Sequence, residues 1–197
     1  MKRIIFASRN RGKIEEIRAM LEGSGIELKS LLDYPGIPEV VEDGSSFFEN
    51  ALKKAKTVSE YTGEAALADD SGLEIDCLQG RPGIYSARYS GEDATDEKNN
   101  AKVLSELDGV SWEERTAAFR CVLVMYIPGS DYKAFEGKWQ GRVGFEPRGT
   151  MGFGYDPIFV DTTLGKTAAE LPPEIKNRVS HRAQAFRKFK ESLTELP

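Results

Sequence analysis

The sequence predicts an α/β fold built on a mixed sheet. Strand-like and helix-like segments are interleaved without strict alternation, which favours a sheet with both parallel and antiparallel neighbours. Two long strand patterns flank the turn signal Pro128-Gly129-Ser130, and they predict an antiparallel hairpin. The 197 residues carry no internal repeat and no linker long enough to separate two domains, so we expect a single domain over residues 1–197.

The individual elements follow from local patterns of apolar residues. Apolar or alternating runs predict strands at residues 3–7, 65–69, 73–78, 117–127 and 132–143. Apolar residues at helical spacing predict a first helix that contains Ile14, Ile17 and Leu21, and further helices at residues 46–61, 94–107 and 177–193. The helix that starts at Ser46 carries Glu49 three residues later, which is the spacing of a capping box.

Composition excludes several classes of protein. The chain has 32 acidic and 27 basic residues, a net charge of -5 and a pI near 5.2, so its surface as a whole is not a basic field for nucleic acid. Its longest apolar run, residues 121–127, is far shorter than a membrane span requires. Cys77 and Cys121 lie in unrelated segments without a CxxC pair, which is typical of a reducing compartment. We therefore expect a cytoplasmic protein with no membrane association and no stable nucleic-acid partner.

The loop between the first strand and the first helix is a candidate phosphate site. Its sequence is Ser8-Arg9-Asn10-Arg11-Gly12-Lys13. The N-terminus of a helix offers backbone N–H groups and a partial positive charge, while Ser8, Asn10 and Lys13 add donors and a cation. The loop lacks the pattern of a P-loop, and an ordinary capped loop with solvated cations is the alternative.

Two acidic segments are candidates for binding a cation. They are Glu42-Asp43-Gly44 and Asp69-Asp70-Ser71-Gly72. Asp69 and Asp70 follow an apolar strand, and adjacent carboxylates at a strand end repel each other unless a cation or donor compensates them. Carboxylate oxygens suit Mg²⁺, which typically takes one or two protein carboxylates together with substrate phosphates. The alternative is that these acids only cap the turns that follow them.

An aromatic residue between two glycines is a candidate base-binding residue. Phe153 lies between Gly152 and Gly154, which leaves the face of its ring open to a planar partner. Asp156 is near enough in the sequence to accept hydrogen bonds from a purine edge. The alternative is a glycine-rich turn whose aromatic residues fill the core.

A basic group near the start of the last predicted helix is the final candidate. It consists of Lys176 and the pair His181-Arg182, and His181 is the single histidine of the chain. These side chains could donate hydrogen bonds to a base or a phosphate. The alternatives are a structural histidine and a solvated basic helix face.

Together these segments resemble the inosine/xanthosine triphosphate pyrophosphatase family, whose members remove non-standard purine nucleoside triphosphates. Each of the six matching strings alone is weak evidence for the family. All six occur in family order between residues 8 and 182, and that order is specific to the family. Two small departures are the variable loop positions of Arg9 and Arg11 and the presence of Met151 where a second glycine is common. The matching strings are Ser8-Arg9-Asn10-Arg11-Gly12-Lys13, Glu42-Asp43-Gly44 through Phe47-Phe48-Glu49-Asn50-Ala51, Ala68-Asp69-Asp70-Ser71-Gly72-Leu73, Pro82-Gly83-Ile84-Tyr85-Ser86-Ala87-Arg88-Tyr89, Gly152-Phe153-Gly154-Tyr155-Asp156-Pro157 and Ser180-His181-Arg182.

The resemblance implies an elongated, two-lobed mixed-sheet fold with a central cleft, of the inosine triphosphatase type, in a chain that forms a homodimer. It also implies an enzyme, a nucleoside triphosphate pyrophosphatase. That enzyme would use Mg²⁺ to hydrolyse ITP, dITP and XTP between the α- and β-phosphates, which releases the monophosphate and pyrophosphate and cleanses the nucleotide pool.

Roles for individual residues also follow from the resemblance. Asp70 would orient or deprotonate the attacking water, and Mg²⁺ would be held by Glu42, Asp70 and Asp69. The loop and Lys54 would face the triphosphate, Phe153 would stack on the base, and Lys176, His181 and Arg182 are candidate donors to the purine O6. The full set of implied substrate-binding residues is Ser8, Arg9, Asn10, Arg11, Gly12, Lys13, Lys54, Ser71, Phe153, Gly154, Tyr155, Asp156, Lys176, His181 and Arg182.

Two other functions remain open at this level. One is a related pyrophosphatase that acts on modified pyrimidines or other altered bases. The other is a non-catalytic module that binds nucleotides or nucleic acid, which the basic last helix favours and which the net negative charge and the Asp69-Asp70 pair oppose.

Overall fold

The structure is a computed structural model that describes residues 2–194. Its backbone forms two compact units. Unit 1 contains the described residues up to Asp70, the segment Cys121–Gly137 and the described residues from Arg182 onward. Unit 2 contains Ser71–Arg120 and Lys138–His181.

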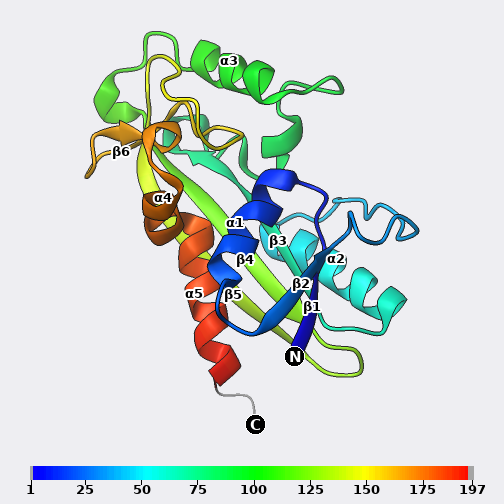
Figure 1. Cartoon of the computed structure of the whole chain (residues 1–197). Helices are drawn as coiled ribbons and strands as arrows, with labels where there is room; N and C mark the ends of the chain where they lie inside the picture. The colour runs from blue at the N-terminus through cyan, green and yellow to red at the C-terminus, as the bar shows by residue number, and fades with distance from the viewer. Residues whose placement is uncertain (1, 195–197) are drawn as a thin grey trace. The chain divides into compact units, whose positions relative to one another are not determined.

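The strands of the described residues form one mixed sheet. They are β1 (Lys2–Phe6), β2 (Ile26–Ser30), β3 (Ala66–Ile75), β4 (Thr116–Tyr126), β5 (Tyr132–Val143), β6 (Phe159–Asp161) and β7 (Lys166–Thr167). Their order in the sheet is β2-β1-β3-β4-β5-β6-β7 (Figure 1). β1 is parallel to β2 and β3, whereas β6 is antiparallel to β5 and β7, so the predicted mixed sheet is confirmed. β4 and β5 are neighbours joined by the predicted turn.

The helices lie between these strands and after the last of them in the chain. The α-helices are α1 (Arg11–Leu21), α2 (Phe47–Thr62), α3 (Asp96–Glu106), α4 (Pro173–Val179) and α5 (His181–Thr194), and the short 3₁₀ helices are η1 (Asp76–Leu78), η2 (Gly83–Arg88), η3 (Trp112–Glu114) and η4 (Ala168–Glu170). The described part of the chain has no helix of the length and apolarity that crossing a bilayer demands.

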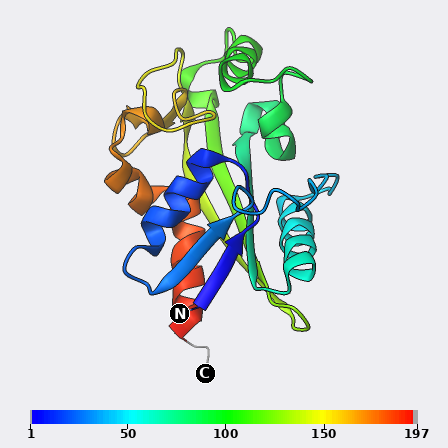
Figure 2. The ribbon, with the colours of Figure 1, turned by 45° about the vertical axis from the view of Figure 1, so that its right-hand side comes forward.

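Unit 1 has helices on both faces of its strands. α1 and α5 lie on one face, and α2 lies on the other (Figure 2). The core on the first side joins Ile17 of α1, Phe6 of β1 and Phe186 of α5, all of them buried. On the other side α2 turns the apolar stripe of Ala51, Ala55 and Val58 inward, as its spacing predicts.

Unit 2 has a separate core rich in aromatic rings. Phe119 of β4 lies 4.5 Å from Phe159 of β6, centroid to centroid, and the ring of Trp139 from β5 is 5.0 Å from Phe159. α3 contributes Val103, and the residue that follows the helix contributes Leu107, both fully buried, to the same cluster. This core supports the loop that carries Phe153, because Tyr155 and Ile158 at the end of that loop are buried in it.

The helix starts follow from capping side chains. Asn10 caps α1, since its side chain accepts a hydrogen bond from Lys13 N at 3.0 Å. Ser46 caps α2 by accepting from Glu49 N, as predicted. The second half of the predicted capping box is different: the Glu49 carboxylate accepts hydrogen bonds from Ser45, through its backbone N at 2.6 Å and its hydroxyl at 2.8 Å.

Two predicted boundaries are wrong. The strands predicted at 65–69 and 73–78 are one strand, β3, so Asp69 and Asp70 lie inside a strand rather than at its end. The helix predicted from Asn177 is two helices, because Ser180 adopts an extended conformation (φ -64°, ψ 159°) between α4 and α5. The break makes His181 the first residue of α5.

Candidate active site

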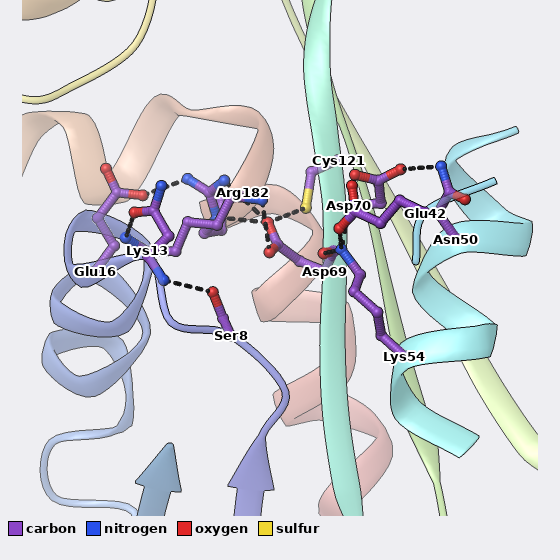
Figure 3. A network of polar contacts seen from close by, with 11 residues as sticks. Ser8, Lys13, Glu16, Glu42, Asn50, Lys54, Asp69, Asp70, Cys121 and Arg182 are labelled. Atoms are coloured by element: carbon purple, nitrogen blue, oxygen red, sulfur yellow. Dashed lines mark hydrogen bonds and ion pairs between the residues drawn. The ribbon is translucent and has the colours of Figure 1, made fainter. Parts of the chain in front are cut away.

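The two adjacent acids of β3 point to opposite faces of the sheet. Consecutive side chains of a strand alternate between faces, so Asp69 and Asp70 cannot share one set of partners. Asp69 turns toward α1 and α5, whereas Asp70 turns toward α2 (Figure 3). The pleat of the strand therefore separates the two charges that appeared to repel each other in the sequence.

Asp69 is held by two cations. Its Oδ1 lies 3.0 Å from Lys13 Nζ, and its Oδ2 accepts hydrogen bonds from Arg182 Nη2 at 2.9 Å and Nε at 3.0 Å. Arg182 also forms a 2.5 Å ion pair with Glu16. Burial alone would raise the pKa of the Asp69 carboxyl, but Lys13 and Arg182 hold that pKa well below its usual range. Asp69 is therefore ionised in the folded protein.

The pairing of β1 with β3 brings the predicted phosphate loop to Asp69. The strands are parallel, with Phe6 opposite Leu67, and Ala7 N donates to Leu67 O at 2.7 Å. The chain that leaves β1 at Ser8 is therefore level with the segment that precedes Asp69. Asn10 N donates to Ser8 Oγ at 3.1 Å, which closes the loop and leads into α1.

Asp70 belongs to a second cluster on the α2 side. Asn50 Nδ2 donates to Asp70 Oδ2 at 3.0 Å, and Lys54, one turn further along α2, lies 3.8 Å from Asp70 Oδ1. Lys54 Nζ also contacts Glu42 Oε1 at 2.6 Å and the backbone oxygen of Asp69 at 2.7 Å. Two carboxylates from distant segments thus converge on one ammonium group.

Gly44 explains how Glu42 reaches this cluster. Its backbone N donates to Asn50 Oδ1 at 2.8 Å, which ties the loop to α2. A Cβ at Gly44 would lie 2.7 Å from that same oxygen and 2.8 Å from Glu49 Cβ. Only glycine fits, which accounts for the Glu42-Asp43-Gly44 string.

The Asp70 cluster has the chemistry of a divalent-cation site. Burial raises the pKa of Asp70 against the opposing charges of Lys54 and Lys13. For Lys54 burial acts to lower the pKa, and Asp70 and Glu42 outweigh it, so the net shift is upward. Asp70 and Glu42 already share one cation, and two carboxylates are the protein contribution that Mg²⁺ typically takes beside a polyphosphate. Residues 2–194 contain no group of three or more His, Cys, Asp or Glu side chains placed to hold a metal by themselves.

The Phe153 loop forms a third cluster, within unit 2. Phe153 N donates to Asp156 Oδ2 at 2.9 Å, and Lys176 Nζ contacts the same oxygen at 2.5 Å. Lys176 Nζ also lies 4.9 Å from the centroid of the Phe153 ring. The ring of Phe153 is half-buried, and Asp156 and Lys176 are buried beneath it.

Other predicted residues have structural partners of their own. His181 is buried and stacks on Phe119, with ring centroids 4.7 Å apart. The Tyr155 hydroxyl donates to Ser86 O at 2.7 Å from inside the unit 2 core, so its ring is a packing element. Arg9 Nη2 donates to Ile37 O at 2.8 Å, while Arg11 is exposed at the start of α1.

Two residues of these clusters were not predicted as site residues. Asn50 precedes Lys54 by four positions on α2, and this spacing places both on the same helix face. Glu16 follows Lys13 by three positions on α1 in the same way. The helical spacing from a predicted site residue is the signal that could have identified both.

Comparison with known proteins decides the family. The model of the Ham1 family matches residues 4–192. The chain belongs to the Ham1 family. A dITP/XTP pyrophosphatase from Geobacter sulfurreducens is 55% identical over 193 residues, which cover 98% of this chain and 97% of that protein. A dITP/XTP pyrophosphatase from Geobacillus kaustophilus is 50% identical and covers 100% of this chain and 96% of its own.

Solved structures of Ham1 proteins have the same fold. A HAM1 protein from Coxiella burnetii superposes with a TM-score of 0.90 at 40% identity and covers 100% of both chains. The α/β fold with a mixed sheet expected from the sequence is thereby confirmed.

Proposed function

We propose that this Ham1-family protein hydrolyses non-standard purine nucleoside triphosphates, dITP, ITP and XTP, to the monophosphate and pyrophosphate. The observation that carries the proposal is the convergence of Asp70 and Glu42 on Lys54, next in the strand to Asp69, which pairs with Lys13 of the Ser8–Lys13 loop. Relatives that match this chain over nearly its whole length are named dITP/XTP pyrophosphatases, which supports the same substrate class.

Glu42 and Asp70 would hold Mg²⁺, the cation that their oxygens fit. When bound, Mg²⁺ supplies Lewis-acid chemistry and neutralises phosphate charge. We assign Asp69 a different part from the one expected. Its two oxygens face Lys13 and Arg182, so we propose that it positions the Lys13 ammonium rather than binding the metal.

The polar side chains around Asp70 suit phosphoryl chemistry, which needs positioning and charge neutralisation more than a covalent intermediate. Asp70 would orient the attacking water and accept its proton. Lys54 and Lys13 would pair with phosphate oxygens. Asn50 would hold the Asp70 carboxylate in place through the 3.0 Å hydrogen bond.

The Phe153 cluster would bind the purine. The aromatic face provides stacking, and Lys176 beside it provides a donor for the 6-oxo group, which adenine lacks. A buried donor left without a partner by the 6-amino analogue disfavours that analogue strongly. Ser71, His181 and the loop arginines keep their proposed substrate contacts. Gly154 would contact the base without a hydrogen bond, and Arg182 would act through Asp69.

The direct test incubates purified protein and Mg²⁺ with dITP, XTP, ATP and dUTP in parallel. We expect dIMP or XMP and pyrophosphate, with ATP and dUTP turned over far more slowly, and loss of turnover when EDTA removes the metal. Release of dIDP and orthophosphate would contradict the proposed cleavage site. Faster turnover of dUTP than of dITP or XTP would contradict the proposed substrate class.

Three further proposals accompany the function. We propose that the two units act as one catalytic domain, that the enzyme is a homodimer, and that it works in the cytoplasm, where its two free thiols stay reduced. A single unfolding transition followed by both fluorescence and circular dichroism would support the first. Light scattering after gel filtration measures the second, and a monomeric mass would contradict it.

A further inference from the structure

Two side chains of α3 form hydrogen bonds with the backbone next to Phe153. Gly154 N donates to Asp96 Oδ2 at 2.6 Å, and Gly154 O accepts from Asn100 Nδ2 at 3.0 Å. The donor and the acceptor of one residue are therefore both held by the same helix. All of these residues belong to unit 2.

The spacing of Asp96 and Asn100 on α3 allows both to bind Gly154. Asp96 and Asn100 are four positions apart, so they lie on one face of the helix. Asp96 occupies the first turn, directly after the capping residue Thr95, where the helix dipole favours a carboxylate. A backbone oxygen can only accept, which fixes the Asn100 amide with its nitrogen toward Gly154.

Asn100 is a buried residue whose side-chain amide binds the backbone of Gly154. Its side chain is 6% exposed, and among the described residues its Oδ1 has no hydrogen-bond partner. A buried amide of this kind is unfavourable for the core, where apolar side chains such as Val103 would normally stand. Within residues 2–194, the side-chain hydrogen bond that it makes is directed at the Phe153 loop.

The loop needs an external restraint because glycines flank Phe153 on both sides. Gly152 has φ +80° and Gly154 has φ +62°, and glycine confines its own backbone less than any other residue. On the Gly152 side the Asp156 carboxylate supplies the restraint, since its Oδ2 accepts a hydrogen bond from Phe153 N at 2.9 Å. On the Gly154 side the restraint comes from Asp96 and Asn100.

We propose that Asp96 and Asn100 are positioning residues for the base, which act by fixing the backbone that orients the Phe153 ring. This inference rests on the proposed function, because it assigns Phe153 to the purine. Neither side chain would touch the substrate. Their loss should therefore weaken binding of the base while the phosphate-binding residues of unit 1 keep their affinity.

Product inhibition separates the two effects, because dIMP carries the base and pyrophosphate does not. The wild type is first assayed for conversion of dITP to dIMP and pyrophosphate, and failure there rejects the proposed function itself. In an active enzyme, Asn100→Leu should raise the inhibition constant of dIMP and the KM of dITP by about tenfold, the scale of a small misplacement. The inhibition constant of pyrophosphate should stay within about twofold, well inside that misplacement scale.

Two more variants separate positioning from general damage. Asn99, the buried neighbour of Asn100, donates to Ser86 O and Ala87 O instead of the loop, so Asn99→Leu controls for the loss of a buried amide. We expect that variant to leave both inhibition constants unchanged. Asp96→Ala, at an exposed position, should repeat the effect on dIMP, and Asp96→Asn, which keeps an acceptor oxygen, should restore it.

Certain results would overturn the inference. Unchanged dIMP inhibition in both Asn100→Leu and Asp96→Ala would remove α3 from base recognition. An equal loss of dIMP and pyrophosphate inhibition would reduce the two residues to a structural role.

Discussion

Arg182 donates from Nε and Nη2 to a single oxygen of Asp69, at 3.0 and 2.9 Å. The arginine is 2% exposed and Asp69 is 1% exposed, so neither charge is solvated by water. Lys13 balances the second oxygen of Asp69, and Glu16 balances the far end of Arg182. The four residues form an alternating chain of charges between α1, β3 and α5, and this chain joins the start of α1 to the last helix.

Removal of Arg182 should destabilise the protein. Arg182→Gln leaves the buried Asp69 carboxylate with Lys13 alone, and breaking a buried pair typically costs about 3–5 kcal/mol of unfolding free energy. Urea unfolding measures the change. Arg187→Gln, at an exposed position of the same helix, should change the free energy by less than about 0.5 kcal/mol. Equal effects of both substitutions would refute the importance of the buried pair.

The stability that Asp69 contributes should depend on acid pH. Its pKa is lower in the folded protein than the 3.8 of an ordinary aspartate, so the contribution is present above that pKa and is lost as the pH falls below about 4. We expect the difference in unfolding free energy between wild type and Asp69→Asn to decrease as the pH falls from about 5 to about 3. The decrease should reach up to about 1.4 kcal/mol per pH unit. A constant gap would contradict the assignment.

Asp70→Asn should abolish turnover without unfolding the protein. The amide keeps an oxygen for the Asn50 hydrogen bond, but it can neither accept a proton nor bring a negative charge to a cation. We expect kcat for dITP to fall by about a hundredfold or more. The matched control is Asp43→Asn, which removes an exposed acid that pairs with Lys53 at 2.6 Å. Near-normal turnover by the Asp70 variant would exclude Asp70 from the chemistry.

Phe153→Ala should weaken substrate binding. Stacking of a base on an aromatic ring contributes about 1–3 kcal/mol, so the KM for dITP should rise by about fivefold to a hundredfold. Phe145→Ala, which truncates a ring that is 61% exposed on the same unit, is the control. If steady-state kinetics give the same KM for Phe153→Ala and wild type, Phe153 does not stack on the base.

The two thiols should react differently. Cys77 is exposed, whereas Cys121 is buried 3.9 Å from Asp69, and burial together with that carboxylate raises the pKa of Cys121 to about 12. A thiol-specific dye should therefore label one cysteine in the native protein and both in urea. Native Cys77→Ser protein should take up almost no dye, and rapid labelling of that variant would show that Cys121 is accessible.

Local patterns predicted α1 and α2 well. The apolar spacing of α1 and α2 and the capping residue Ser46 each depend on neighbours within one or two turns, which the sequence displays directly. The six motifs also led to the correct family, because their order along the chain is specific. The mixed sheet followed from the irregular order of strands and helices.

The errors occurred where distant residues override local preference. Asp69-Asp70-Ser71-Gly72 has the composition of a turn, yet it continues β3 because Lys13, Arg182 and Lys54 neutralise its acids. The Glu16–Arg182 pair joins residues 166 positions apart, which no local pattern can reveal. The stacking of His181 on Phe119 likewise exists only after folding.

The continuity of β3 also sets how evolution or design can alter this enzyme. The side chains of a strand alternate between the two faces of the sheet. Deleting one residue just before Asp69 would therefore turn every later side chain of β3 to the opposite face. Asp69 would then face α2, and Asp70 would face α1 and α5, so the two carboxylates would exchange partners although neither had been lost. Length changes in the surface loops carry no such penalty, so this short stretch should be the part of the chain least tolerant of insertion or deletion.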